Sequence, residues 1–301
     1  MEKIVVEEEN IRLDQYISNI LDISRSKIQK LIKQDKILVN NKVEKGSYLV
    51  KIGDELTIND LLDFSIKVQA KDIKLDILYE DQYLMIINKK SGMVVHPAPG
   101  HYDDTLVNAL LYHLHIDEAS DIRVGIVHRL DKDTSGVMMV AKDDRILEKL
   151  SLMIKNKEVK RHYLALVDGV IGPDSGTIDA PIGRDVNYRE KMSVTDINGK
   201  EAITHFQVIK RYAATTLVEC VLETGRTHQI RVHMAYINHP ITNDPVYNKK
   251  KATEFGQMLH SKSIEFIHPV TGEKIYYEVE PPKGFMEILN SLDCLLYTSP
   301  S

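Results

Sequence analysis

The stretch His128-Arg129-Leu130-Asp131-Lys132-Asp133-Thr134-Ser135-Gly136 joins two apolar runs, residues 124–128 and 137–141, which have the length and composition of strands. A polar loop rich in Asp, Thr, Ser and Gly is a common connection between strands. The residue types of this loop therefore predict a turn. By themselves they favour a structural role over a catalytic one.

Patterns on both sides of this loop predict an α+β domain over residues 75–292. Strand-like runs occupy residues 75–79, 84–88, 163–167, 202–209 and 217–222. Helices are expected at residues 105–114, 143–155 and 227–237, where Thr105 and the pair Asp143-Asp144 are suitable starting residues. Strands and helices do not alternate regularly. The pattern therefore favours a mixed, mostly antiparallel sheet over a doubly wound parallel one.

A smaller unit precedes this domain, at residues 10–59. Apolar residues recur at helical spacing in residues 13–21 and 28–32, and strand-like runs follow at residues 37–39, 48–52 and 55–58. This pattern predicts a small α+β domain. We expect residues 60–74 to form a linker. Residues 293–301 have no amphipathic pattern and are predicted to be a non-native tail.

The charge is distributed unevenly along the chain. The net charge is −5, but residues 11–51 contain nine Lys or Arg and four Asp or Glu, so this segment carries +5 and the rest carries −10. Such asymmetry indicates a basic module joined to a more acidic body. The candidate nucleic-acid contacts lie mostly off the apolar stripe of the second helix and are Arg25, Lys27, Lys30 and Lys33. On charge alone, a solvated basic face explains them equally well.

The composition argues against several classes of protein. No apolar run reaches the roughly 18 residues of a membrane span, and the acidic start of the chain lacks the apolar core of a signal peptide. Two cysteines, Cys220 and Cys294, do not make a disulfide framework or a zinc ribbon, and they favour a reducing cytoplasm. His228 and His233 would lie about 140° apart on a helix. Because no HExxH motif and no Gly-rich phosphate loop occurs, we expect neither a metal nor a cofactor.

Four segments resemble, in order, the motifs of the pseudouridine synthase family that includes the large-subunit ribosomal RNA synthases. The first is Lys89-Lys90-Ser91-Gly92-Met93-Val94-Val95-His96-Pro97, and the second is the stretch around Asp131. The third is Arg161-His162-Tyr163-Leu164-Ala165, and the fourth is Thr224-Gly225-Arg226-Thr227-His228-Gln229-Ile230-Arg231-Val232-His233. In front of them, Arg12-Leu13-Asp14, residues 24–32 and Ile37-Leu38-Val39-Asn40 resemble an S4-type RNA-binding domain.

The resemblance implies a cofactor-free isomerase that flips a uridine out of structured RNA, with bacterial large-subunit ribosomal RNA as its substrate. It implies that Asp131 is the catalytic residue, that Arg231 pairs with it and that Tyr163 lies in the active site. It also implies that the second helix of the S4-type domain and the adjoining loop face RNA. We expect the protein to act as a monomer in the cytoplasm.

Elementary chemistry agrees with these roles. A carboxylate can break the N-glycosidic bond of uridine as a nucleophile at the sugar or as a base on it, and both roles need an ionised Asp131. Burial favours the neutral form of a carboxyl group, whereas a guanidinium such as that of Arg231 stays charged and can bind a carboxylate through two hydrogen bonds. Tyr163 offers a ring to stack on uracil and a hydroxyl that could assist proton removal at C5.

Arg129 precedes Asp131 by two residues, so on an extended segment it lies on the same side. It could enter the RNA stack where the uridine leaves, and a surface salt bridge is the alternative. The sequence also departs from the family pattern, which usually has proline at Lys90 and glycine at Asn238, Asn243 and Asn248. Asparagine is the non-glycine residue that best accepts a positive φ, so the sequence predicts that these turns are kept.

Two other functions fit parts of the pattern. A non-catalytic RNA-binding or ribosome-assembly factor could keep the same fold, but the presence of Asp131 and Tyr163 disfavours it. An aspartate-dependent glycoside hydrolase would need a second carboxylate about 5–10 Å from the first, and Asp133 is the obvious candidate nearby.

Overall fold

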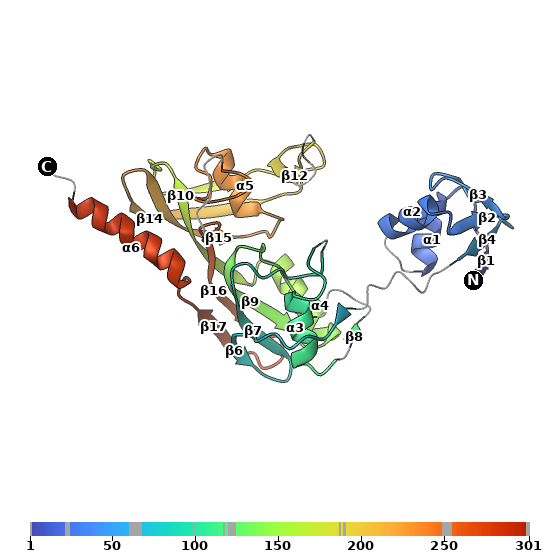
Figure 1. Cartoon of the computed structure of the whole chain (residues 1–301), viewed down its shortest axis with the longest axis horizontal. Coiled ribbons are helices and arrows are strands. Elements are labelled where there is room, and N and C mark those ends of the chain that lie inside the picture. The colour runs from blue at the N-terminus through green and yellow to red at the C-terminus, as the bar shows by residue number, and fades with distance from the viewer. Residues whose placement is uncertain are drawn as a thin grey trace. The chain divides into compact units, whose positions relative to one another are not determined.

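The computed structural model describes residues 2–21, 25–59, 68–98, 100–116, 118–119, 125–186, 188, 191–248 and 255–298. The chain divides into two compact units, residues 1–67 and 68–301 (Figure 1). Each unit has its own cluster of buried apolar side chains. Within these described segments, none of the helices combines the length and the apolar character that a membrane span requires.

The first unit is a small antiparallel sheet packed with two helices, with strand order β1-β4-β2-β3. The strands are β1 (Glu2–Val5), β2 (Ile37–Val39), β3 (Lys42–Val43) and β4 (Glu55–Ile58), and the helices are α1 (Leu13–Leu21) and α2 (Arg25–Lys33). The helical spacing of apolar residues explains the packing, because Leu13, Ile17, Ile28 and Leu31 are all fully buried.

The first unit differs from its predicted form in three places. It begins before residue 10, because β1 pairs with β4 along its whole length. The strand predicted at residues 48–52 is reduced to one bridge between Leu49 and Arg12, since the partner segment enters helix α1 at Leu13. Ile20, which was predicted to lie on the apolar face of the first helix, is 47% exposed.

The second unit is built on a nine-stranded sheet with the order β11-β14-β15-β10-β16-β9-β7-β6, and β17 also pairs with β16. Only β16 and β9 pair in parallel, so the sheet is mixed and mostly antiparallel, as predicted. Its strands are β6 (Ile77–Glu80), β7 (Leu84–Lys89), β9 (Ser135–Ala141), β10 (Lys160–Asp168), β11 (Ser175–Asp179), β14 (Ile203–Arg211), β15 (Thr215–Leu222), β16 (Leu259–Ile267) and β17 (Lys274–Glu278). Two short ladders are β5 (Val68–Gln69) with β8 (Glu118–Ala119) and β12 (Ile182–Arg184) with β13 (Met192–Val194).

The helices of the second unit are α3 (Leu106–His113), α4 (Asp144–Lys155), α5 (Gln229–Tyr236) and α6 (Lys283–Thr298). Thr105 and Asp143 accept hydrogen bonds from the first turns of α3 and α4, as the sequence predicted. Strand β7 is buried on both faces, because Met85 packs in the cluster that contains α3 and Ile86 packs in the one that contains α4.

Three predicted boundaries differ in the second unit. Only Ile126 of the strand predicted at residues 124–128 pairs, in one bridge to Val140, and residue 124 lies outside the described residues. Residues 60–67 of the predicted linker also lie outside them, whereas Val68 is buried in the core of the second unit. Helix α6 continues through the boundary predicted at residue 293, because Phe285, Leu289 and Leu292 pack on the core at helical spacing. Residues 299–301 are not described.

Candidate active site

Two of the sequence motifs meet where strands β7 and β9 pair, with Lys89 opposite Gly136. Three groups of the first motif hold the loop that follows Asp131. The Lys89 ammonium donates to the Lys132 carbonyl (3.0 Å), the Gly92 N–H donates to the same carbonyl (2.9 Å), and the Ser91 hydroxyl donates to the Asp133 carbonyl (2.8 Å). The backbone directly after Asp131 is therefore fixed.

Lys89 is one of the most deeply buried polar side chains of the described chain. Besides the Lys132 carbonyl, its ammonium donates to the carbonyls of Lys90 and Met93, both at 2.9 Å. Burial lowers the pKa of Lys89 to about 7, and the carboxylates of Asp131 and Asp133 oppose that shift. Three carbonyl acceptors match the three donors of an ammonium group, which explains why a lysine occupies this position.

Gly136 ends the motif because a larger residue does not fit there. Its φ is +113°, and a Cβ at this position would lie 2.1 Å from the Ser261 carbonyl oxygen of the neighbouring strand. The parallel contact of β9 with β16 at residues 135–136 and 260–261 depends on this close approach.

Asp131 is held by Arg231 from helix α5. Nη1 of Arg231 lies 2.8 Å from Oδ2 of Asp131, and the other side of the guanidinium binds Asp244 through Nε (2.7 Å) and Nη2 (3.0 Å). Burial opposes the charge of Arg231, but the hydrogen bonds and charges of Asp244 and Asp131 raise its pKa above the usual range. One buried guanidinium thus joins two carboxylates.

Asp244 orients this guanidinium from behind. It is fully buried and also accepts the N–H groups of Val246 (2.8 Å) and Tyr247 (3.0 Å). Burial acts against its ionisation, but the hydrogen bonds from Arg231 and from the backbone outweigh burial and lower the pKa of Asp244. The aspartate is therefore a fixed anion with all its near partners in place.

His228 and Tyr247 complete the surroundings of Asp131. His228 has the left-handed φ of 58° just before α5 begins, and its Nε2 lies 3.8 Å from Oδ1 of Asp131. Its Nδ1 lies 2.9 Å from the Tyr247 hydroxyl, and the Tyr247 ring stacks near the Arg231 guanidinium at 5.2 Å. Burial lowers the pKa of His228 although Asp131 opposes the shift, so a neutral imidazole faces the carboxylate at neutral pH.

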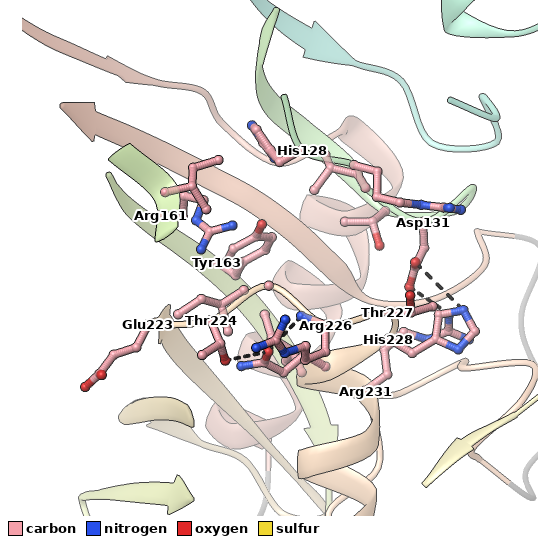
Figure 2. A pocket seen from close by; sticks show the side chains of 18 of the residues that line it. His128, Asp131, Arg161, Tyr163, Glu223, Thr224, Arg226, Thr227, His228 and Arg231 are labelled. Atoms are coloured by element: carbon pink, nitrogen blue, oxygen red, sulfur yellow. Dashed lines mark hydrogen bonds and ion pairs between the residues drawn. The ribbon is translucent and has the colours of Figure 1, made fainter. Parts of the chain in front are cut away.

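Tyr163 and Arg161 lie two residues apart on strand β10, and both line the same cavity of about 680 Å³ as Asp131 and Arg231. Figure 2 shows the Tyr163 ring beside the Arg161 guanidinium, with Asp131 and Arg231 close to each other. Burial raises the pKa of the Tyr163 hydroxyl, which is therefore protonated at neutral pH. Arg129 also lines the cavity, with an exposed side chain.

The structure thus brings Asp131, Tyr163, Arg231 and Arg129, which the sequence predicted as site residues, to one cavity, and their roles stay predictions. Sequence reasoning did not identify Asp244, although it lies in the stretch that was noted for its asparagines. Asn238 and Asn243 do have positive φ, at 66° and 61°. The same expectation was wrong for Asn248, whose side-chain amide instead binds Asp168 and the Ile241 carbonyl.

The four basic residues that the sequence predicted as nucleic-acid contacts on the second helix of the first unit differ in their contacts and in whether their side chains are described. Lys30 and Lys33 are exposed, and the side chain of Lys27 lies outside the described residues. Arg25 is 45% exposed, but it forms an ion pair with the buried Asp14 at 3.1 Å. Its exposure agrees with its predicted position off the apolar stripe, and the ion pair joins it to helix α1.

His233, the second of the two histidines in the fourth motif, has a partner at each ring nitrogen. His233 is buried, and its nitrogens lie 2.9 Å from the Thr204 hydroxyl and 2.9 Å from the Ala180 carbonyl. In the part of the chain that the structure describes, no group of three or more His, Cys, Asp or Glu side chains is arranged to hold a metal ion.

Comparison with known proteins gives consistent matches over most of the chain. The family model for RNA pseudouridylate synthase matches residues 83–236, and the S4 domain model matches residues 11–56. The uncharacterized RNA pseudouridine synthase YlyB of Bacillus subtilis (strain 168) is 46% identical over 95% of this chain and 95% of its own length. The ribosomal large subunit pseudouridine synthase D of Pseudomonas aeruginosa is 42% identical over 93% of this chain and 92% of its own length.

A solved structure agrees with this result. The human RNA pseudouridylate synthase domain containing 1 superimposes with a TM-score of 0.60 at 25% identity, covering 77% of this chain and 98% of that chain. The chain therefore belongs to the RNA pseudouridylate synthase family, and it is an isomerase that carries an S4 domain in front of its catalytic domain.

Proposed function

We propose that the protein converts one or more uridines of bacterial large-subunit ribosomal RNA to pseudouridine, using Asp131 and no cofactor. The observation that carries the proposal is the ion pair between Arg231 and Asp131 inside the cavity that Tyr163 also lines. The guanidinium stabilises the neighbouring carboxylate through a charge-assisted hydrogen bond, and both proposed roles of Asp131 use that carboxylate.

The chemistry has two routes that start from this carboxylate. As a nucleophile, Asp131 forms a bond to C1′ while the C1′–N1 bond breaks and its electron pair leaves with the uracil. As a base, Asp131 removes a sugar proton while the same bond breaks. In the nucleophile route, the bond between Asp131 and C1′ then breaks as C5 bonds to C1′. In the base route, Asp131 returns the proton to the sugar as C5 bonds to C1′. In both routes C5 finally loses its proton and N1 gains one. We propose that the ring of Tyr163 stacks on the uracil and that its hydroxyl assists the removal of the C5 proton.

Base flipping follows from the enclosure of the site. The side chain of Asp131 is only 18% exposed, so a uridine stacked within an RNA helix could not reach it. The nucleotide must therefore leave the stack, which costs a few kcal/mol that protein contacts offset. We propose that the exposed Arg129, beside Asp131 in sequence, fills the space that the uridine leaves.

The substrate class rests on the relatives and on the first unit. Several relatives at about 40% identity are named ribosomal large subunit pseudouridine synthase D. The S4 domain adds exposed lysines on α2, which can contact RNA phosphates.

The cytoplasmic location and the monomeric state stay predictions. The glycoside hydrolase alternative loses support, because Asp133 is not among the residues that line the cavity and Asp244 is bound to Arg231.

The proposed function is tested by mapping pseudouridines in ribosomal RNA from cells with and without this gene. We expect one or more sites in the large-subunit RNA to be lost in the deletion strain. A copy of the gene should restore them, and a copy with Asp131→Asn should not. If every ribosomal pseudouridine is kept in the deletion strain, ribosomal RNA is not the substrate.

A further inference from the structure

Arg161 carries a buried charge for which the described part of the chain provides no partner. The residue is 4% exposed, and its Nε has no hydrogen-bond partner. Arg231 lines the same cavity with the same exposure, but its guanidinium binds two carboxylates. An unpaired buried cation destabilises a folded protein. The retention of Arg161 inside the cavity therefore indicates a ligand that satisfies it.

The surroundings of Arg161 hold the guanidinium in place without neutralising it. A Cβ on Gly225 would lie 3.0 Å from Nη1 of Arg161, so the absence of a side chain at Gly225 makes room for the guanidinium. His128 accepts the N–H of Met139 through Nε2 at 3.1 Å. Burial and the charge of Arg161 lower the pKa of His128 to about 3, so this neighbour is neutral.

Two of the three acidic residues that line the cavity have other partners, and the third, Glu201, is exposed. Asp131 is bound to Arg231, and Glu223 is bound to Lys157 and His205. Arg226, a further cation of the cavity, donates its Nε to the Glu201 carbonyl at 2.8 Å. Arg161 thus differs from Asp131, Glu223 and Arg226, because it lines the same cavity (Figure 2) and its buried Nε has no hydrogen-bond partner among the described residues.

We infer that Arg161 binds the uracil base of the flipped nucleotide through a carbonyl oxygen, an inference that rests on the proposed function. Depth favours the base over a phosphate, because a residue that is 4% exposed meets only the part of the nucleotide that enters furthest. Tyr163, two residues along β10, presents the ring on which that base stacks. When the C1′–N1 bond breaks, its electron pair leaves with the base, and negative charge spreads to the carbonyl oxygens. A fixed guanidinium stabilises that charge in the transition state.

The first test measures single turnovers at saturating RNA for Arg161→Met and Arg161→Lys. The Met variant should lose about 10²-fold in rate, as when one donor to a developing oxyanion is removed. The Lys variant should be intermediate, because it keeps the charge but not the planar donors. RNA affinity should change less than threefold. A Met variant that loses affinity and salt dependence while keeping its rate would show a phosphate contact and overturn the inference.

The second test compares the thermal stability of the free proteins. Because Arg161 has no partner, Arg161→Met should raise the Tm by about 2–4 °C. The matched control is Arg226→Met, which removes a cation of the same cavity that does have a partner, and its Tm should stay equal or fall. A lower Tm for Arg161→Met than for wild type would show that Arg161 holds the fold together instead.

The third test locates the contact on the base. RNA substrates carry 2-thiouridine or 4-thiouridine at the target position, because sulfur accepts hydrogen bonds more weakly than oxygen. At one of the two positions, the rate losses from the sulfur and from Arg161→Met should not multiply, since both changes remove the same contact. Fully multiplicative losses at both positions contradict the inference. If the wild-type protein forms no pseudouridine in ribosomal RNA, the proposed function is wrong. If wild type is active and Arg161→Met is equally active, only the role of Arg161 is wrong.

Discussion

Nη1 of Arg231 lies 2.8 Å from Oδ2 of Asp131, and the same guanidinium is anchored to the buried Asp244 by its two other donor nitrogens. The anchor acts from the side away from substrate, so the geometry of the ion pair exists before RNA binds. Preorganised charges of this kind are effective in catalysis because they need no rearrangement during the reaction.

Replacing Arg231 tests whether it acts through the charge of Asp131. Arg231→Met should lower turnover about 10²-fold or more while RNA affinity changes little. Arg231→Lys should be intermediate, because it keeps the charge but not the planar donors. Single-turnover rates and RNA affinities measured for both variants decide the matter. Unchanged turnover with only the affinity reduced would show that Arg231 does not act in catalysis.

Asp244 should act through Arg231 rather than on RNA. Asp244→Asn leaves Arg231 with one anion instead of two and should lower the free energy of unfolding by about 3–5 kcal/mol, because one partner of a buried ion pair is lost. Turnover should fall, but less than in Arg231→Met. The double variant should lose less than the product of the single losses, since both changes affect one unit. Independent, multiplicative losses in turnover would show that Asp244 has a separate role.

Acid stability should depend on His128. Its pKa in the folded protein is about 3, below the value of 6.5 for a free imidazole, so the unfolded chain binds more protons between these values. The contribution of His128 is complete above pH 6.5 and is lost as the pH falls through that window. From pH 7 to pH 5 the loss should be about 2 kcal/mol. His128→Gln, which keeps an acceptor for the Met139 N–H, should lose less stability over this range in urea unfolding. If wild type and His128→Gln lose the same free energy of unfolding over this pH range, His128 has the same pKa in the folded and the unfolded protein.

The S4 domain should contribute to the salt dependence of RNA binding. Replacing Lys30 and Lys33 together by glutamine should reduce the slope of log affinity against log salt by about 1.5, if each lysine neutralises one phosphate. The matched control replaces Lys274 and Lys283, exposed lysines of β17 and α6, and should leave the slope unchanged. Equal slopes for the two double variants would show that this face of α2 does not contact RNA.

Some of the site could be predicted from the sequence because it depends on short motifs. The loop around Asp131 and the segments of Tyr163 and Arg231 are recognisable as short sequence motifs, and their order along the chain supported the resemblance to the family. The helix starts at Thr105 and Asp143 were also predicted, because a cap is a local feature.

Other features depend on contacts between distant segments. Asp244 becomes part of the site only because the turn at Asn243 places it behind Arg231, 13 residues earlier in the chain. His228 reaches Asp131 only because its backbone adopts a left-handed conformation, which no residue pattern indicated. Arg161 belongs to the third of the four motifs, but the sequence does not indicate that it lacks a partner. That follows only from the residues that surround it in the folded protein.

In the proposed mechanism the carboxylate of Asp131 performs the reaction, and the Asp131→Asn variant removes that carboxylate with little change in shape. An amide can still accept a hydrogen bond from Arg231, but it is neither a nucleophile nor a base at the sugar. Pseudouridine formation would be measured in single turnovers on the RNA that is mapped as the substrate, together with RNA affinity. We expect the variant to bind RNA within about threefold of wild type and to form no detectable pseudouridine. A rate within tenfold of wild type would contradict the account.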